Sequence, residues 1–213
     1  MMITFFALLI GLVIGIVIAT VRSTFDKNRE EYKKKGGFFY FIWWIVNAIC
    51  NIYLTVVRGT PVVVQLLICY FIVFASSRNG VAVAIFAFGI NSGAYMAELI
   101  RSGINAVDRG QMEAARSLGL SYWRSMFRVV LPQAIKNMIP SIVNQFIITL
   151  KDTSILSVIG FPELVNKAQN VIAITFKSFQ TWAIVAVMYL VVILTLQQIA
   201  NALERRLSRG RKL

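Results

Sequence analysis

The chain contains 213 residues, of which 58% are hydrophobic, more than the roughly 45–50% typical of soluble domains. It has 22 lysines and arginines against 9 aspartates and glutamates, a net charge of +13, although only 15% of its residues are charged. This composition excludes an ordinary soluble domain and indicates a membrane protein with basic loops, and it argues against a nucleic-acid-binding protein because the basic residues lie between long apolar runs.

Six segments are apolar enough to be considered for crossing a bilayer, which takes about 20 apolar residues. They are 2–21, 38–57, 61–77, 81–99, about 137–160, and 180–203. Between them, segments 22–37, 100–136 and 204–213 carry six, six and five basic residues. Because basic loops stay in the cytoplasm, all three are predicted to be cytoplasmic, and an even number of crossings must separate any two of them. Three apolar segments lie between the first two basic segments, so one of the three does not span.

We expect segment 38–57 to be the one that does not span. Asn47, Asn51 and Thr55 recur at helical spacing and give the segment a polar stripe, and its two adjacent tryptophans suit the headgroup region. The segment is therefore predicted to lie along the cytoplasmic face of the membrane. The alternative is a true span whose polar stripe faces neighbouring helices.

The predicted fold is all-α, a single polytopic membrane domain over 1–213 with five transmembrane helices. The predicted spans are about 2–21, 61–77, 81–99, 137–160 and 180–203. The N-terminus is then outside and the C-terminus cytoplasmic. The first apolar run has no basic segment before it, so we expect a retained span rather than a signal peptide. Within this span Gly11 and Gly15 form a GxxxG pattern, which permits close helix contact.

The cytoplasmic loop, about 107–134, has the pattern of two short helices. Asp108 followed three residues later by Gln111 resembles a capping box, and Gly119 is placed to end the first helix in the left-handed conformation. Ser121 then caps a second helix, which Pro132 closes. An ordered loop of this length is typical of a docking surface. The alternative is a solvated connector.

Several motifs follow one another along the chain. Two lie in the loop, Glu113-Ala114-Ala115 with Gly119, and Leu131-Pro132-Gln133-Ala134. The others are Arg58-Gly59-Thr60-Pro61, Ala94-Tyr95-Met96-Ala97-Glu98 and Lys151-Asp152-Thr153-Ser154. The loop motifs resemble the EAA loop in permease subunits of ATP-binding-cassette (ABC) importers, and the others resemble the polar amino acid branch of that family, the histidine, glutamine and arginine type. The resemblance extends from about residue 3 to Arg206.

The resemblance implies the type I ABC importer permease fold in a bacterial inner membrane. It implies a permease dimer, formed by a second copy or by a sister permease, two partner ATPase subunits, and an extracytoplasmic amino-acid-binding protein. It also implies that segment 113–119 is a coupling helix that docks into the ATPase. The residues expected to couple are Glu113, Ala114, Ala115, Arg116 and Gly119.

Polar residues at membrane depth are the candidates for substrate contact. Asp152 is expected to pair with the ammonium group of the substrate. Thr153 and Ser154 are expected to offer hydroxyls to the carboxylate group of the substrate. The alternative is that Asp152 pairs only with a neighbouring cation such as Lys151.

Other polar residues carry weaker predictions. Asn91, Ser92 and Gln65 are further candidates for substrate contact, with interhelical hydrogen bonding as the alternative. Glu98 and Arg101, three residues apart, are expected to form a structural ion pair.

We expect the chain to transport without performing chemistry of its own. Histidine is absent, which removes the commonest metal ligand and general base, so we expect no catalytic centre, metal site or cofactor. No phosphate-binding loop of the GxxxxGK[ST] type is present either, so energy must come from a partner. Two other classes stay open from the residues alone: an ion-coupled secondary transporter or channel, and a non-transporting membrane anchor or sensor subunit.

Overall fold

The computed structural model describes residues 1–35, 37–76 and 79–209, and this part of the chain is helical with no strand. The helices are α1 (Met2–Lys35), α2 (Gly37–Gly59), α3 (Val62–Ile68), α4 (Gly80–Asn105), α5 (Arg109–Ser117), α6 (Tyr122–Ser125), α7 (Leu131–Asp152), α8 (Leu164–Thr175) and α9 (Ser178–Arg209). Short π-helical turns follow α3 (Cys69–Val73) and α6 (Met126–Val130), and a 3-10 helix follows α7 (Thr153–Ile159). The predicted all-α class is confirmed.

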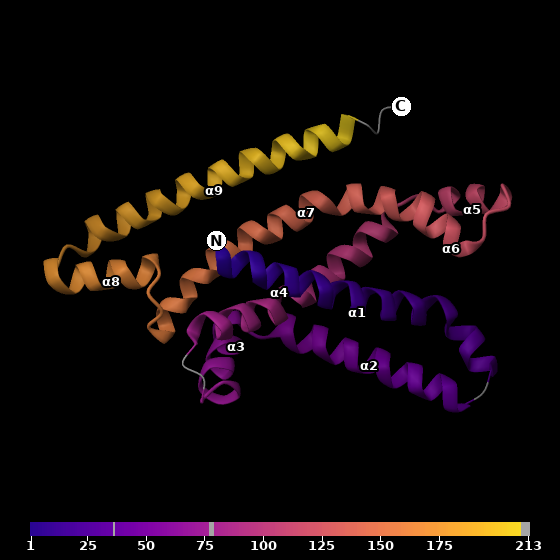
Figure 1. The fold of residues 1–213 in the computed structure, drawn as a ribbon, viewed down its shortest axis with the longest axis horizontal. Helices are drawn as coiled ribbons and strands as arrows, with labels where there is room; N and C mark the ends of the chain where they lie inside the picture. The colour runs from indigo at the N-terminus through magenta and orange to yellow at the C-terminus, as the bar shows by residue number, and fades with distance from the viewer. Residues whose placement is uncertain (36, 77–78, 210–213) are drawn as a thin grey trace.

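The long helices run back and forth along one direction (Figure 1). Helices α1, α4 and α9 run one way, and α2 and α7 run the opposite way. The end of α1, the start of α2, the α5–α6 segment and the end of α9 all lie toward the right of the figure, whereas α3 and α8 lie toward the left. The described parts of the three basic segments therefore lie toward the same end, as an even number of crossings between them requires.

Five helical segments are long and apolar enough to cross a membrane, but they are not the five that the sequence predicted. They are Met2–Lys27, Tyr40–Gly59, Gly80–Asn105, Tyr122–Ile159 and Ser178–Arg206. The set includes Tyr40–Gly59, which covers most of the segment 38–57 that was predicted to lie in the membrane plane, and omits 61–77. The apolar helix there covers only Val62–Val73, about 18 Å at 1.5 Å per residue, too short for a core about 30 Å thick. The prediction of a continuous span over 61–77 is wrong.

The contacts of α2 and α3 with α4 explain how the passage is divided. The last turns of α2 pack beside the middle of α4, where the Tyr53 hydroxyl donates to the carbonyl of Ile90 at 2.6 Å and Leu54 clusters with Ala94. Helix α3 then continues along the first half of α4, with Leu66 packed in the cluster that contains Val83. Helices α2 and α3 thus lie one after the other along α4, with a break at 59–61, and together count as one crossing. An even number of crossings therefore still separates the first two basic segments.

The polar stripe of α2 faces protein. Asn51 and Thr55 line a cavity together with residues of α1 and α4, and the Asn47 side-chain oxygen is buried without a hydrogen-bond partner. This is the arrangement of the alternative prediction, in which the stripe faces neighbouring helices. From the sequence alone, a polar stripe cannot distinguish a helix in the membrane plane from a span whose stripe faces other helices. Lipid headgroups and neighbouring helices both accept polar side chains.

Helices α1 and α4 pack closely because small residues alternate across their contact. A Cβ added to Gly11 would lie 2.8 Å from the Cβ of Ser92, and one added to Gly15 would lie 2.6 Å from the Cβ of Met96. On the facing helix, a Cβ added to Gly93 would lie 2.8 Å from the Cγ2 of Ile14. Glycine thus allows the two backbones to approach closely, as the GxxxG pattern predicted.

Candidate functional site

The loop between α4 and α7 is ordered by local capping. Asp108 begins α5, and its carboxylate accepts a hydrogen bond from the Gly110 amide at 2.6 Å. Gly119 ends the helix with φ +84°, and the Leu120 amide donates to the Ala115 carbonyl, so the predicted left-handed ending is confirmed. The side chain of Gln111 does not complete a capping box, because its oxygen accepts a hydrogen bond from Gln133 instead.

Most residues of the predicted coupling segment are available to a partner. Glu113, Ala114, Arg116 and Gly119 are exposed, and only Ala115 is buried.

Apolar side chains surround this segment. Leu118 is 84% exposed, Trp123 61% and Phe127 60%, and the rings of Trp123 and Phe127 stack with centroids 6.0 Å apart. Large exposed apolar side chains next to charged ones are typical of a surface that a partner covers.

The loop is fixed to the bundle. Lys27 of α1 places its ammonium over the ring of Tyr122, 2.8 Å from the centroid. Val107 and Val130, at the two ends of the loop, are buried in one cluster with Met138 of α7. The loop is therefore packed onto α1, α4 and α7.

The predicted substrate residues Gln65 and Asn91 form a hydrogen-bonded network at the break between α2 and α3. The Gln65 amide donates to the carbonyls of Val57 at 2.7 Å and Thr60 at 3.1 Å, which satisfies acceptors left free where α2 ends. The Asn91 amide nitrogen in turn donates to the Gln65 oxygen at 3.0 Å. This is the interhelical hydrogen bonding that the sequence left as the alternative.

Ser92 is also engaged between helices. Ser92 is only 1% exposed. Its hydroxyl lies 3.3 Å from the hydroxyl of Thr149 in α7, and the side-chain amide of Gln145 donates to the same Thr149 hydroxyl. The contact joins the middle of α4 to the last turn of α7.

Replacing Asn91 with leucine is expected to destabilise the protein by about 1–3 kcal/mol, because the partly buried Gln65 oxygen loses its donor. The measurement is the thermal unfolding midpoint of the detergent-solubilised protein. The control is Asn105→Leu, the same substitution at the exposed end of α4. Equal midpoints for the two variants would show that the network adds no stability.

Asp152, Thr153 and Ser154 lie where α7 changes from α-helix to 3-10 helix. Asp152 is half-buried, and among the described residues it forms no ion pair, including with Lys151. The Thr153 hydroxyl donates to the carbonyl of Leu150 at 2.7 Å. Within the part of the chain that the structure describes, the Asp152 carboxylate has no partner of opposite charge.

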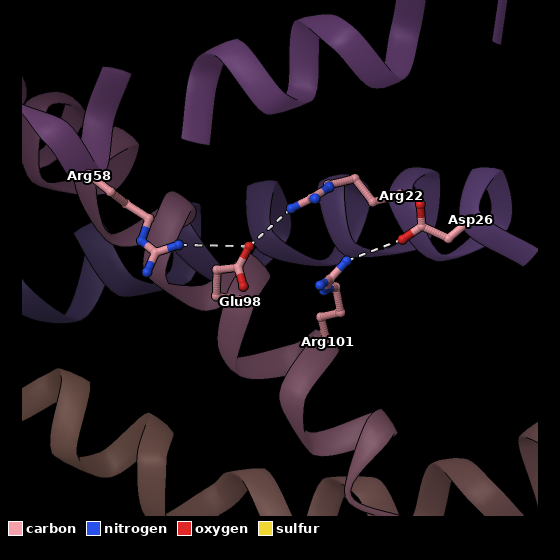
Figure 2. A network of polar contacts seen from close by, with 5 residues as sticks. All are labelled: Arg22, Asp26, Arg58, Glu98 and Arg101. Carbon is pink, nitrogen blue, oxygen red and sulfur yellow. Dashed lines mark hydrogen bonds and ion pairs between the residues drawn. The ribbon is translucent and has the colours of Figure 1, made fainter. Parts of the chain in front are cut away.

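The sequence did not predict a cluster of Arg22, Arg58 and Glu98, which joins α1, α2 and α4 (Figure 2). Arg22 donates to Glu98 Oε1 at 3.0 Å, and Arg58 lies 3.8 Å from the same oxygen. Arg101 pairs with Asp26 at 3.1 Å, so the predicted pair of Glu98 with Arg101 is wrong. A lone arginine between two apolar segments, as Arg58 is, was the available signal.

Taken together, a bundle of long apolar helices, an ordered loop with exposed charged and apolar residues, and polar groups buried between helices define a membrane transport subunit that docks onto a partner. The comparisons agree. Residues 37–209 match the family described as binding-protein-dependent transport system inner membrane component, and the chain belongs to this family.

Relatives from two bacteria are similar over almost the whole chain. The glutamine transport system permease protein GlnP of Escherichia coli K12 is 38% identical over 201 residues, 92% of this chain and 84% of the relative. The arginine transport system permease protein ArtQ of Bacillus subtilis 168 is 38% identical over 203 residues, 93% of this chain and 84% of the relative.

Two solved structures share the fold. A crystal structure of an amino acid ABC transporter with histidines has a TM-score of 0.81 at 37% identity, covering 96% of this chain and 88% of that chain. The MetNI methionine ABC transporter, inward facing, has a TM-score of 0.74 at 16% identity, covering 96% and 91%, and at that identity it supports the fold alone. The chain is therefore a non-catalytic importer permease of the inner membrane, with ATP hydrolysed by a partner.

Proposed function

We propose that this permease imports a polar amino acid that an extracytoplasmic binding protein delivers. The observation that carries the proposal is the 38% identity, over more than nine-tenths of the chain, to permeases named for glutamine and for arginine. The family assignment argues against both alternatives from the sequence, an ion-coupled carrier or channel and a non-transporting anchor.

The proposed complex holds two ATPase subunits and two permeases, the second being another copy or a sister chain. Support comes from α9, because only 6% of its most apolar stretch is buried within this chain. Lipid and a second permease can cover the exposed apolar side chains. The end that carries the α5–α6 loop and the C-terminus is proposed to be cytoplasmic, since the basic segments lie there.

The α5 helix is proposed to transmit ATPase closure to the bundle. Glu113, Ala114, Arg116 and Gly119 would contact the ATPase, and Ala115 would fasten the helix to the protein behind it. Because the loop is packed onto α1, α4 and α7, its displacement would move these helices together between inward-open and outward-open arrangements.

Asp152 is proposed to bind the ammonium group of the amino acid. The hydroxyls of Thr153 and Ser154 would then donate to the carboxylate group of the same amino acid. An unpaired carboxylate at membrane depth is costly, which favours a role in binding. Gln65, Asn91 and Ser92 would contact substrate only in a state in which their present hydrogen bonds open.

Replacing Asp152 with asparagine is expected to reduce amino acid uptake about tenfold or more, because a hydrogen bond to a charged group contributes about 1.5–3 kcal/mol. Uptake by proteoliposomes that contain the permease, its ATPase and its binding protein measures the effect. The matched control is Glu204→Gln, a carboxylate replaced at the exposed end of α9. Unchanged uptake and ligand-stimulated ATPase activity in Asp152→Asn would refute the ammonium role.

A further inference from the structure

The cluster of Arg22, Arg58 and Glu98 carries an excess positive charge, since two guanidinium groups share one carboxylate. Arg58 lies 3.8 Å from the carboxylate oxygen, which is too long for a hydrogen bond. The Nε of Arg22 is buried without a hydrogen-bond partner. The two guanidinium groups thus have donors that the carboxylate does not satisfy, and such donors favour an anionic ligand.

These side chains border a cavity that is large enough for a small molecule. The cavity has a volume of about 460 Å³, within the roughly 300–1,000 Å³ of small-molecule sites. Besides the three charged residues, it is lined by the polar side chains of Asn51 and Thr55 and by the ring of Tyr95. The Arg58 guanidinium lies 5.9 Å from the centroid of that ring, which restricts the directions in which the guanidinium can point.

The cavity is separate from Asp152. The contact between Ser92 and Thr149 sets the register of α4 against α7. From that level Asp152 is three residues away toward the end of α7, and Glu98 is six residues away toward the loop. At 1.5 Å per residue the two carboxylates are about 13 Å apart along the helices. The α-ammonium and α-carboxylate groups of an amino acid share one carbon, so they cannot reach both places at once.

We propose that this cavity is a second, cytoplasm-side binding site, which takes the α-carboxylate of the amino acid after it leaves Asp152. The inference rests on the proposed function, because it takes an amino acid as the cargo. Arg58 and Arg22 bind the carboxylate, and Glu98 competes with it for the same guanidinium groups. The return of Glu98 to both arginines displaces the cargo and favours its release.

The test is a calorimetric titration of the full complex in phosphatidylcholine nanodiscs. The probes are L-glutamine, L-arginine and their α-amides, which lack the carboxylate. Arg58→Gln is expected to lower the preference for the acid over the amide about tenfold, the usual scale for one charge-assisted pair. Glu98→Gln is expected to strengthen acid binding, because the competing carboxylate is gone. Arg101→Gln, which removes a charge paired with Asp26 outside the cavity, is expected to change nothing.

The opposite signs for Arg58→Gln and Glu98→Gln separate a binding site from a structural ion pair, which both variants would weaken alike. Equal acid preference in Arg58→Gln and Arg101→Gln overturns the inference while the proposed function stands, provided the unmodified complex binds a probe acid. A complex that binds none of the probes overturns both. An Arg58→Gln variant that loses bound phosphatidylglycerol in native mass spectrometry but keeps its acid preference identifies a lipid site and overturns the inference as well.

Discussion

A permease with Glu113→Arg and Gly119→Val is expected to lose coupled transport almost completely. Gly119 has φ +84°, a conformation that costs an ordinary side chain about 1–2 kcal/mol and a β-branched one more. Valine there should unwind the end of α5, and arginine at 113 should reverse a charge on its exposed face. The measurement is co-purification of the ATPase, together with ATPase stimulation by loaded binding protein.

Two milder variants control for simple misfolding. Gly119→Asn keeps the left-handed conformation accessible, because asparagine tolerates it, and Glu113→Gln keeps the side-chain size without reversing charge. Both are expected to retain the ATPase. A double variant that still co-purifies with a fully coupled ATPase would show that α5 is not the docking element.

Replacing Gly15 with alanine is expected to destabilise the protein by about 1–3 kcal/mol, the usual cost of overpacking. The added Cβ would lie 2.6 Å from the Cβ of Met96 and 3.0 Å from the backbone nitrogen of Ala97. Backbone atoms cannot move aside as a flexible side chain does, so α1 and α4 must separate. The thermal unfolding midpoint in detergent should fall by several degrees, since about 1 kcal/mol corresponds to roughly 2–4 °C at this size.

Gly37→Ala makes the matched comparison, because nothing lies within 4 Å of the Cβ it would add. Alanine in a helix is about 0.5–1 kcal/mol more favourable than glycine, so this variant should be neutral or slightly stabilised. The same chemical change should therefore lower the midpoint at Gly15 and leave it unchanged or slightly raised at Gly37. If Gly15→Ala melted at or above the temperature of Gly37→Ala, close backbone packing would not hold α1 to α4.

Features set by a few neighbouring residues could be predicted from the sequence. The start of α5 at Asp108, its end at Gly119 and the approach of α1 at Gly11 and Gly15 depend on local backbone conformation or side-chain size. These properties belong to the residue itself, so a pattern in the sequence reveals them.

Features set by packing between distant segments could not. Glu98 and Arg101 are correctly spaced for a pair on one helix. In the structure, however, Glu98 pairs with Arg22 and Arg101 pairs with Asp26, both of which lie on α1. The break between 38–57 and 61–77 was predicted, but the short length of the helix that follows it was not. Hydropathy measures how apolar a segment is and not where its helix ends, and here the apolar helix covers only Val62–Val73.

The most direct test of the central claim is ATP-driven uptake of L-glutamine and L-arginine by proteoliposomes that contain the permease, its ATPase and its binding protein. We predict accumulation of at least one of the two amino acids, lost when ATP, the ATPase or the binding protein is left out. Accumulation that persists without the ATPase and follows an ion gradient would contradict the account, and so would a complete system that accumulates no amino acid.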